Sequence, residues 1–527
     1  MSEAGSGVEA GPSVGASARG VGAAAGIGSG SLGRTEAGRR FALTGVEQER
    51  LASNLRKAVK RARRSGEQTL ASISLALPVE VDPTEVACAS RRAGEPWFVL
   101  EQPDRGRAAL AGLGEATVLE ASGPQRFEQV ARRWRELSAA AVGEGAIAVG
   151  GFSFAPDGGA LPHWRDYEPA SLVVPEVALT RHGPGAQRRA GAVERAKGGE
   201  RAVAGIDRQA TVSMTLTALV SPDDVPEGPL ARLLARVEEL QERPLPLLDP
   251  APAGRFQVAS AMPPEHFESA VARARELIGQ GRLEKIVLAR EVQVHAPSPY
   301  DPAAVLGVLR EEFPSCFTFC VGRGDAAFVA ASPELLVRRE GHRVSTLALA
   351  GSTRRSADPA VDDHLGEQLL RDESYREEHA IVARRIERML RAHAVWVAAA
   401  GEPELVRIAN IQHLATPIRA QLASPMDALE LVGMMHPTPA VGGEPLARAA
   451  PLIPALEGLD RGWYAGPVGW TDATGDGEFC VALRCALLRG TVARCYAGNG
   501  IVRDSEPAAE LAETEIKLQA LLPLLAG

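Results

Sequence analysis

The chain has 527 residues, of which 45% are hydrophobic and 24% are charged, a balance typical of globular proteins with a large apolar core. Its formal net charge is -8 and its isoelectric point is about 5.8, so we expect no nucleic-acid partner. No apolar run approaches the roughly 20 residues that a membrane-spanning helix needs, and we expect no membrane association.

The first 40 residues are dominated by Gly, Ala and Ser and lack the hydrophobic block of a signal peptide. Scattered arginines would suit a transit peptide, but interspersed glutamates weaken that reading, and we predict a disordered tail over 1–40. The six cysteines match neither a zinc-site spacing nor a disulfide framework. We therefore expect reduced, buried cysteines in a cytoplasmic protein.

Residues 41–255 are predicted to form the N-terminal half of the fold. Leucine and valine recur at four-residue spacing in 47–64, which predicts a basic helix there. Apolar runs bounded by Gly and Pro predict strands at 145–154 and 171–179. A proline-rich connector near residue 250 then separates this half from the region 256–524.

The second half carries a denser pattern of predicted elements. Helices are expected at 266–280, 374–395 and 507–522, and strands at 285–294, 328–338, 344–350, 405–410, 463–470, 478–488 and 491–497. Strands and helices mix without regular alternation, so the predicted fold class is α+β.

Two predicted helices carry candidate metal ligands. Glu510, Glu513 and Lys517 share one side of the final helix, where two carboxylates one turn apart could bind a hard cation such as Mg²⁺ or Ca²⁺. The alternative is a solvated Glu513–Lys517 pair. Glu378 lies in line with an apolar stripe, so it is either buried with a partner or metal, or a solvated acid that favours the helix dipole.

Three further charged residues lie in strongly apolar surroundings. Lys285 heads an apolar strand and is either a strand-end charge that reaches water or a desolvated amine. Glu334 follows a proline within a strand region and could be a general acid or a strand-edge charge. Arg484 needs an anion if its segment is buried, and a bound carboxylate or a structural acid would serve equally.

Glycine clusters at 442–443 and 498–500 could cradle a carboxylate with bare backbone N–H groups, or could be plain turn glycines. No dinucleotide-binding or phosphate-loop pattern is present, and no nucleophile elbow.

The order of the motifs is more specific than any one of them, because together they resemble the chorismate-utilising enzymes, and most closely the isochorismate synthases. The matching segments are EKIVLAR (284–290), ASPELL (331–336), LAGSTR (349–354), EH (378–379), IQHLATPI (411–418), HPTPAVGG (436–443), YAGPVGW (464–470), Arg484, GNGIV (498–502) and ELAETEIK (510–517). The resemblance covers about 256–522 firmly and the N-terminal half loosely.

This resemblance implies a fold of two facing β-sheet layers with outer helices and a set of site roles. Lys285 would be the base that activates water for attack at C2 of chorismate, and Glu334 the acid that protonates the departing C4 hydroxyl. Glu378 and Glu513 would bind Mg²⁺, with Glu510 as a water-mediated ligand. The expected substrate-binding residues are His413, Gly443, Arg484, Gly500 and Lys517.

The resemblance also implies chorismate as substrate, no glutaminase subunit, and a monomer or homodimer feeding menaquinone or siderophore synthesis. Aminating relatives usually carry Gln at the position of Lys285, which argues against them. Salicylate synthase and a non-catalytic chorismate-binding protein are the alternatives. Tyr375 and Asn499 depart from the family pattern, where an acidic residue and a small Ala are usual.

Overall fold

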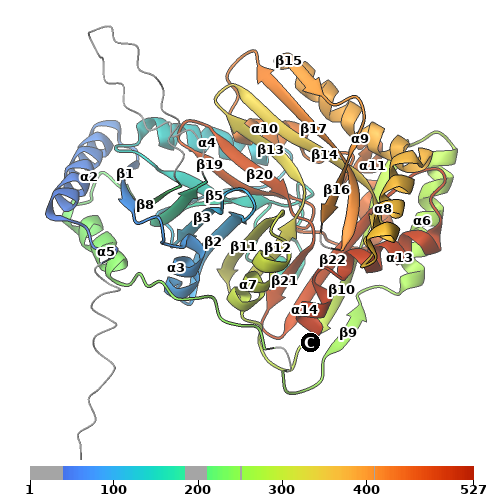
Figure 1. The fold of residues 1–527 in the computed structure, drawn as a ribbon. Coiled ribbons are helices and arrows are strands. Elements are labelled where there is room, and N and C mark those ends of the chain that lie inside the picture. The colour runs from blue at the N-terminus through green and yellow to red at the C-terminus, as the bar shows by residue number, and fades with distance from the viewer. Residues whose placement is uncertain (1–39, 184–209, 250–251, 409) are drawn as a thin grey trace, which may run out of the picture.

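The computed structural model describes residues 40–183, 210–249, 252–408 and 410–527, so the predicted tail lies outside the described residues except for its last position. Within these ranges the framework is a pair of antiparallel β-sheets with helices packed around them (Figure 1). The predicted α+β class and the two sheet layers are confirmed.

The larger sheet has 12 strands. In spatial order they are β1 (Thr69–Leu77), β8 (Thr211–Val220), β7 (Val177–His182), β3 (Ala108–Leu113), β2 (Gly94–Gln102), β11 (Phe317–Gly324), β12 (Ala326–Ser332), β21 (Cys485–Arg489), β22 (Val492–Ile501), β10 (Lys285–His295) and β18 (Gly443–Glu444), with β9 (Gln257–Ser260) also paired to β10.

The smaller sheet has 10 strands. Their order is β15 (Ala394–Ala399), β17 (Ile411–Leu422), β14 (Arg343–Arg354), β13 (Leu335–Glu340), β20 (Gly477–Val481), β19 (Pro467–Asp472), β5 (Ile147–Phe152), β6 (Ala170–Val174) and β4 (Thr117–Ala121), with β16 (Glu404–Ile408) also paired to β17. Each sheet takes strands from both sides of position 255, since β2 pairs with β11 and β5 pairs with β19.

The helices surround these sheets. They are α2 (Gly45–Ser65), α3 (Pro83–Ser90), α4 (Arg126–Ala140), α5 (Glu227–Glu238), α6 (Pro264–Gly279), α7 (Pro302–Glu312), α8 (Pro359–Arg371), α9 (Glu373–Arg391), α10 (Ala428–Met435), α11 (Leu446–Ala449), α12 (Leu452–Glu457), α13 (Pro507–Leu518) and α14 (Leu522–Ala526), with a short 3₁₀ turn at Pro162–Trp164.

Two hydrophobic cores hold the layers together. One contains inward-facing residues of both sheets, such as Phe328 from β12 and Phe479 from β20. The other lies between the larger sheet and helices including α2 and α7, with Leu55 and Leu306 among its buried residues. All six cysteines are buried and unpaired, as expected of packing residues.

Three predicted strands are each split in two, and the second and third of these breaks contribute residues to the cavity described below. The expected strand 171–179 becomes β6 and β7, which belong to different sheets on either side of Pro175. The expected strand 328–338 breaks at Pro333 and Glu334, between β12 and β13. The expected strand 478–488 likewise breaks between β20 and β21, and Arg484 at the break has a left-handed φ of 50°. Apolar runs cannot reveal such crossings, because both pieces are buried.

The predicted helices on which the site depends are present, with shifted ends. α9 begins after Asp372, whose carboxylate accepts hydrogen bonds from the N–H groups of Ser374 and Tyr375. It ends at Arg391 rather than 395, and α13 ends at Leu518 rather than 522. Pro507 opens α13 at the first turn, where its missing N–H costs no hydrogen bond.

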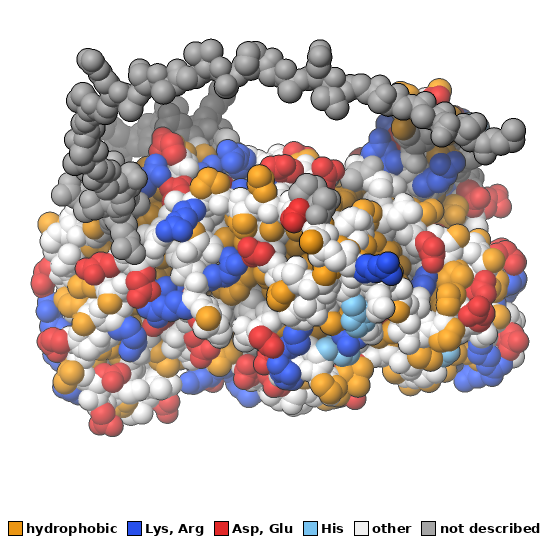
Figure 2. Space-filling view, turned by 90° about the horizontal axis from the view of Figure 1, so that it is seen from below, with side chains coloured by type: hydrophobic (Ala, Val, Ile, Leu, Met, Phe, Trp, Pro, Cys, Tyr) orange, Lys and Arg blue, Asp and Glu red, His pale blue; other side chains and the backbone are white. Residues whose placement is uncertain are grey.

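In the described ranges no helix is long and apolar enough to cross a membrane. On the face seen in Figure 2, basic and acidic side chains are interspersed, without one broad field of either sign. This face offers no extended basic surface of the kind that binds nucleic acid.

Candidate active site

A cavity of about 300 Å³ lies where the two sheets meet α9 and α13. Its walls come from β14, β17, β22, the breaks that follow β12 and β20, and the two helices. Most of the residues predicted for the site line it. They are Glu334, Glu378, His413, Arg484, Gly500, Glu510, Glu513 and Lys517.

Lys285 lies directly behind this lining, with a completely buried side chain. Its Nζ is 2.8 Å from Oε1 of Glu378, which comes from the second turn of α9. The contact is close enough for an ion pair but lacks the angles of a hydrogen bond, so Nζ has no hydrogen-bond partner within the described residues. The amine is therefore desolvated at the cavity and does not reach bulk water.

Glu334 is 3% exposed at the break between β12 and β13 and faces the cavity. Burial raises the pKa of Glu334 to about 8, although the positive charges of Lys285 and Arg484 oppose the rise. A carboxyl group with this pKa is largely protonated at neutral pH and can donate a proton.

Arg484 supplies a partly buried positive charge on another wall. Its guanidinium NH2 lies 3.3 Å from Nε2 of His413, on β17, and no carboxylate in the described part of the chain forms an ion pair with it. Burial and the charges of Arg484 and Lys517 hold the pKa of His413 well below its usual range, so the imidazole is neutral. A structural acid, one of the two predicted partners of Arg484, is not found among the described residues, and a bound anion stays a prediction.

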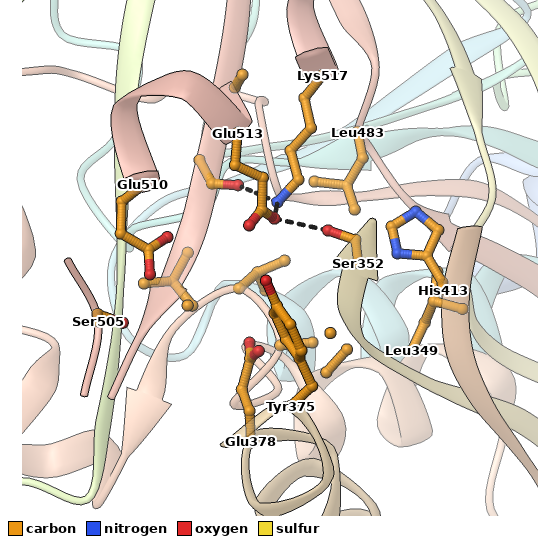
Figure 3. A pocket seen from close by; sticks show the side chains of 18 of the residues that line it. Leu349, Ser352, Tyr375, Glu378, His413, Leu483, Ser505, Glu510, Glu513 and Lys517 are labelled. Atoms are coloured by element: carbon orange, nitrogen blue, oxygen red, sulfur yellow. Dashed lines mark hydrogen bonds and ion pairs between the residues drawn. The ribbon is translucent and has the colours of Figure 1, made fainter. Parts of the chain in front are cut away.

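Helix α13 brings three charged side chains to the cavity. The ammonium of Lys517 lies 2.8 Å from Oε1 of Glu513 and donates hydrogen bonds to Oδ1 of Asn499 and the carbonyl oxygen of Gly498. Glu513 also accepts a hydrogen bond of 2.6 Å from Ser352 of β14. Figure 3 shows Lys517, Glu513 and Ser352 close together in the upper part of the view.

Glu510 adds a third carboxylate. Burial and the charge of Glu513 raise the pKa of Glu510 to about 7. In Figure 3 the ring of Tyr375 stands beside Glu378, with its hydroxyl directed toward Glu513. Burial, followed by the charges of the three glutamates, raises the pKa of Tyr375. This wall therefore gathers three carboxyl groups and a phenol hydroxyl around one part of the cavity.

The donor chemistry of this wall fits a hard divalent cation, which prefers carboxylate and hydroxyl oxygens. Glu378 and Glu513, however, are each held by a lysine. No group of three or more His, Cys, Asp or Glu side chains in the described residues is gathered closely enough to hold a metal ion. The oxygens are of the right kind, but the carboxylates would have to converge on a bound ion.

The two glycines predicted for substrate binding differ in position. Gly500 lines the cavity, and a Cβ there would lie 2.2 Å from Oε1 of Glu378 and 2.5 Å from Cε of Lys285. Gly443 is not part of the lining. It pairs with Ile286 and sits against the backbone carbonyl of Lys285, while Ala440 and Val441 of the same loop face the cavity.

One buried ion pair beside the site was not among the residues expected from the sequence. Arg461 lines the cavity, forms an ion pair with Glu457, and donates hydrogen bonds to the carbonyl oxygens of Val287 and Val441. Glu457 in turn accepts a hydrogen bond of 2.7 Å from the N–H of Ala289. The pair braces the strand that carries Lys285. Its i, i+4 spacing was the only available signal, and it is common on solvated helices.

His379, next to Glu378, takes no part in the cavity. Its Nε2 lies 2.8 Å from the hydroxyl of Thr416 and its Nδ1 lies 3.3 Å from the carbonyl oxygen of Ala350. Burial lowers the pKa of His379 to about 4, as expected for a satisfied core histidine.

Comparison with known proteins gives a consistent picture. The family model described as "Chorismate binding enzyme" matches residues 57–193 and 202–526. The salicylate biosynthesis isochorismate synthase of Pseudomonas aeruginosa is 36% identical over 85% of this chain and 88% of its own length. The isochorismate synthase MenF of Bacillus subtilis is 30% identical over 79% of this chain and 85% of its own length.

Solved structures agree. The menaquinone-specific isochorismate synthase MenF from Escherichia coli superimposes with a TM-score of 0.70 at 26% identity, covering 90% of this chain and all of that one. These matches establish the family. The chain is an enzyme of the chorismate-binding family and belongs to the isochorismate synthase group within it.

Proposed function

We propose that this enzyme converts chorismate to isochorismate with Mg²⁺, with Lys285 as the base and Glu334 as the acid. The observation that carries the proposal is the burial of an amine, Lys285, and a carboxyl group, Glu334, beside one cavity. In its neutral form, the amine of Lys285 accepts a proton from a water molecule, and the oxygen of that water attacks C2 of the ring. Glu334 protonates the C4 hydroxyl, which leaves as water. One water enters and one leaves, so the net reaction is an isomerisation.

The charged walls suit a dianionic substrate. Arg484 and Lys517 are proposed to hold the enolpyruvyl carboxylate, with the backbone at Gly500 beside it and neutral His413 at the ring. Glu378 and Glu513, with Glu510 through water, would hold Mg²⁺, which when bound neutralises the ring carboxylate. Without such an ion, the three glutamates would repel that carboxylate.

The names of the relatives support a proposal for the pathway that uses the product. Their names include salicylate biosynthesis in Pseudomonas aeruginosa and a menaquinone-specific enzyme in Escherichia coli. Isochorismate from this enzyme would accordingly feed menaquinone or siderophore synthesis.

The test is incubation of the purified enzyme with chorismate and Mg²⁺, followed by chromatography of the products. Isochorismate as the product supports the proposal. Salicylate with released pyruvate would instead show a salicylate synthase, and tight binding without turnover would show a non-catalytic chorismate-binding protein.

A further inference from the structure

Asn499 lies near the C-terminal end of β22, between two glycines that line the cavity. Gly498 and Gly500 face the cavity, and because successive side chains of a strand point to opposite faces, Asn499 faces away from it. Its side chain is 2% exposed and lies against α13. It therefore touches the site only through that helix.

Both ends of the Asn499 amide are used. Nδ2 donates hydrogen bonds of 2.8 Å to the carbonyl oxygen and to Oε2 of Glu510, and Oδ1 accepts a hydrogen bond of 2.7 Å from Nζ of Lys517. Glu510 and Lys517 are seven residues apart and share one face of α13. One amide thus spans two turns and joins a carboxylate to an ammonium group.

The chemistry of this link is directional. An amide offers donors at one end and an acceptor at the other, while a carboxylate only accepts and an ammonium only donates. Lys517 donates hydrogen bonds to Gly498 and Asn499 and forms an ion pair with Glu513. An apolar residue at position 499 would remove one partner from each of two largely buried charged groups, which is costly.

We propose that Asn499 is a positioning residue that fixes Glu510 for cation binding and Lys517 for carboxylate binding, an inference that rests on the proposed function. Losing a hydrogen bond to a charged group typically weakens the dependent interaction by about tenfold or more. Asn499 acts at both ends of α13, so its loss is expected to impair both kinds of binding.

The test compares Asn499→Leu with Asn410→Leu in the full-length enzyme. Asn410 is a matched control because its Nδ2 also donates a hydrogen bond to α13, at the carbonyl oxygen of Ile516, and does not touch a charged group of the cavity. Mn²⁺ affinity is measured by electron paramagnetic resonance without substrate. The KM for chorismate is measured in an activity assay at saturating Mg²⁺. Asn499→Leu should weaken Mn²⁺ binding and raise KM, each by about tenfold. Asn410→Leu should lower thermal stability with both values within about twofold of the wild type.

Double variants show whether Asn499 acts through the two charged residues. In a Glu510→Gln background, Asn499→Leu should no longer weaken Mn²⁺ binding, and in a Lys517→Met background it should no longer raise KM. Three results would each overturn the inference. Asn499→Leu could keep the wild-type Mn²⁺ affinity and KM, Asn410→Leu could change both as strongly, or the effects of Asn499→Leu could persist in both double variants.

Two further results separate failure of this inference from other failures. If Asn499→Leu does not fold, Asn499→Asp takes its place in the test. The Asp side chain still presents an acceptor to Lys517, so the KM of this variant should stay within about threefold of the wild type. A rise in KM of about tenfold would contradict the inference. Failure of the proposed function would already be visible in the wild type, as no Mn²⁺ binding or no turnover of chorismate.

Discussion

Nζ of Lys285 lies 2.8 Å from Oε1 of Glu378, although 92 residues separate them in the chain between β10 and α9. The amino group of Lys285 is fully buried, and Gly500 leaves just enough room for both side chains. The pair connects the proposed base to a proposed metal ligand, so substitution at either residue should affect chemistry more than folding.

Replacing Lys285 with Met should abolish turnover and leave the fold intact, because Met fills a similar apolar volume without a proton acceptor. A general base typically contributes about 10²- to 10⁴-fold to the rate, so kcat should fall by that order. Lys57→Met on the exposed face of α2 is the matched control and should keep full activity. Full activity in Lys285→Met would remove the base assignment.

Glu334 should impose an upper pH limit on activity. Its pKa of about 8 leaves the carboxyl protonated below that value, so the rate should decline as pH rises through about 8. Glu334→Gln should abolish turnover at every pH. A rate profile that stays flat well above that pH would contradict the role of Glu334 as acid.

The same shift makes a separate prediction about stability. In the folded chain the pKa of Glu334 is raised above its ordinary value, to about 8. At pH values between the ordinary pKa and about 8, the folded chain therefore binds more protons than the unfolded chain. The free energy of unfolding falls as pH rises through this window. Glu334→Gln removes this penalty. Its Tm relative to the wild type should therefore be higher at about pH 8 than at about pH 5. An unchanged Tm difference would indicate that the carboxyl ionises normally.

Chelation should separate activity from folding. EDTA is expected to remove turnover, added Mg²⁺ to restore it, and Tm to stay nearly constant, because Glu378 and Glu513 fall back on Lys285 and Lys517. Glu513→Gln should raise the Mg²⁺ concentration needed for half-maximal activity. Undiminished turnover in excess chelator would refute the metal requirement.

Gly500→Ala should lower activity strongly, since its Cβ would come within 2.2 Å of Oε1 of Glu378 and 2.8 Å of Nζ of Lys285. Gly279→Ala is the comparison: this helical glycine has no neighbouring atom within 4 Å of its added Cβ. That variant should keep full activity and wild-type or slightly higher stability. Equal activity in the two variants would show that the space at Gly500 is not needed.

Local sequence patterns were sufficient to predict the main supporting elements. Four-residue apolar spacing predicted α2, and a continuous apolar run predicted β10 with Lys285 at its start. The motif order predicted which charged residues would gather, and the cavity contains nearly all of them.

Relations between distant segments could not be read in this way. The strand expected around Arg484 is divided, because the chain passes there from the smaller sheet to the larger, and an apolar run contains no record of that crossing. The Lys285–Glu378 contact and the bracing of β10 by Arg461 depend on tertiary packing. Gly443 resembled a lining residue, but the sequence could not show that it supports Lys285 from behind.

The most direct test of the proposed chemistry is the identity of the product that the enzyme forms from chorismate and Mg²⁺, resolved by chromatography over a time course. A buried base and a buried acid acting on one ring predict isochorismate, approaching equilibrium with chorismate and without stoichiometric pyruvate. Recovery of unchanged chorismate, or its conversion to salicylate and pyruvate, would contradict it.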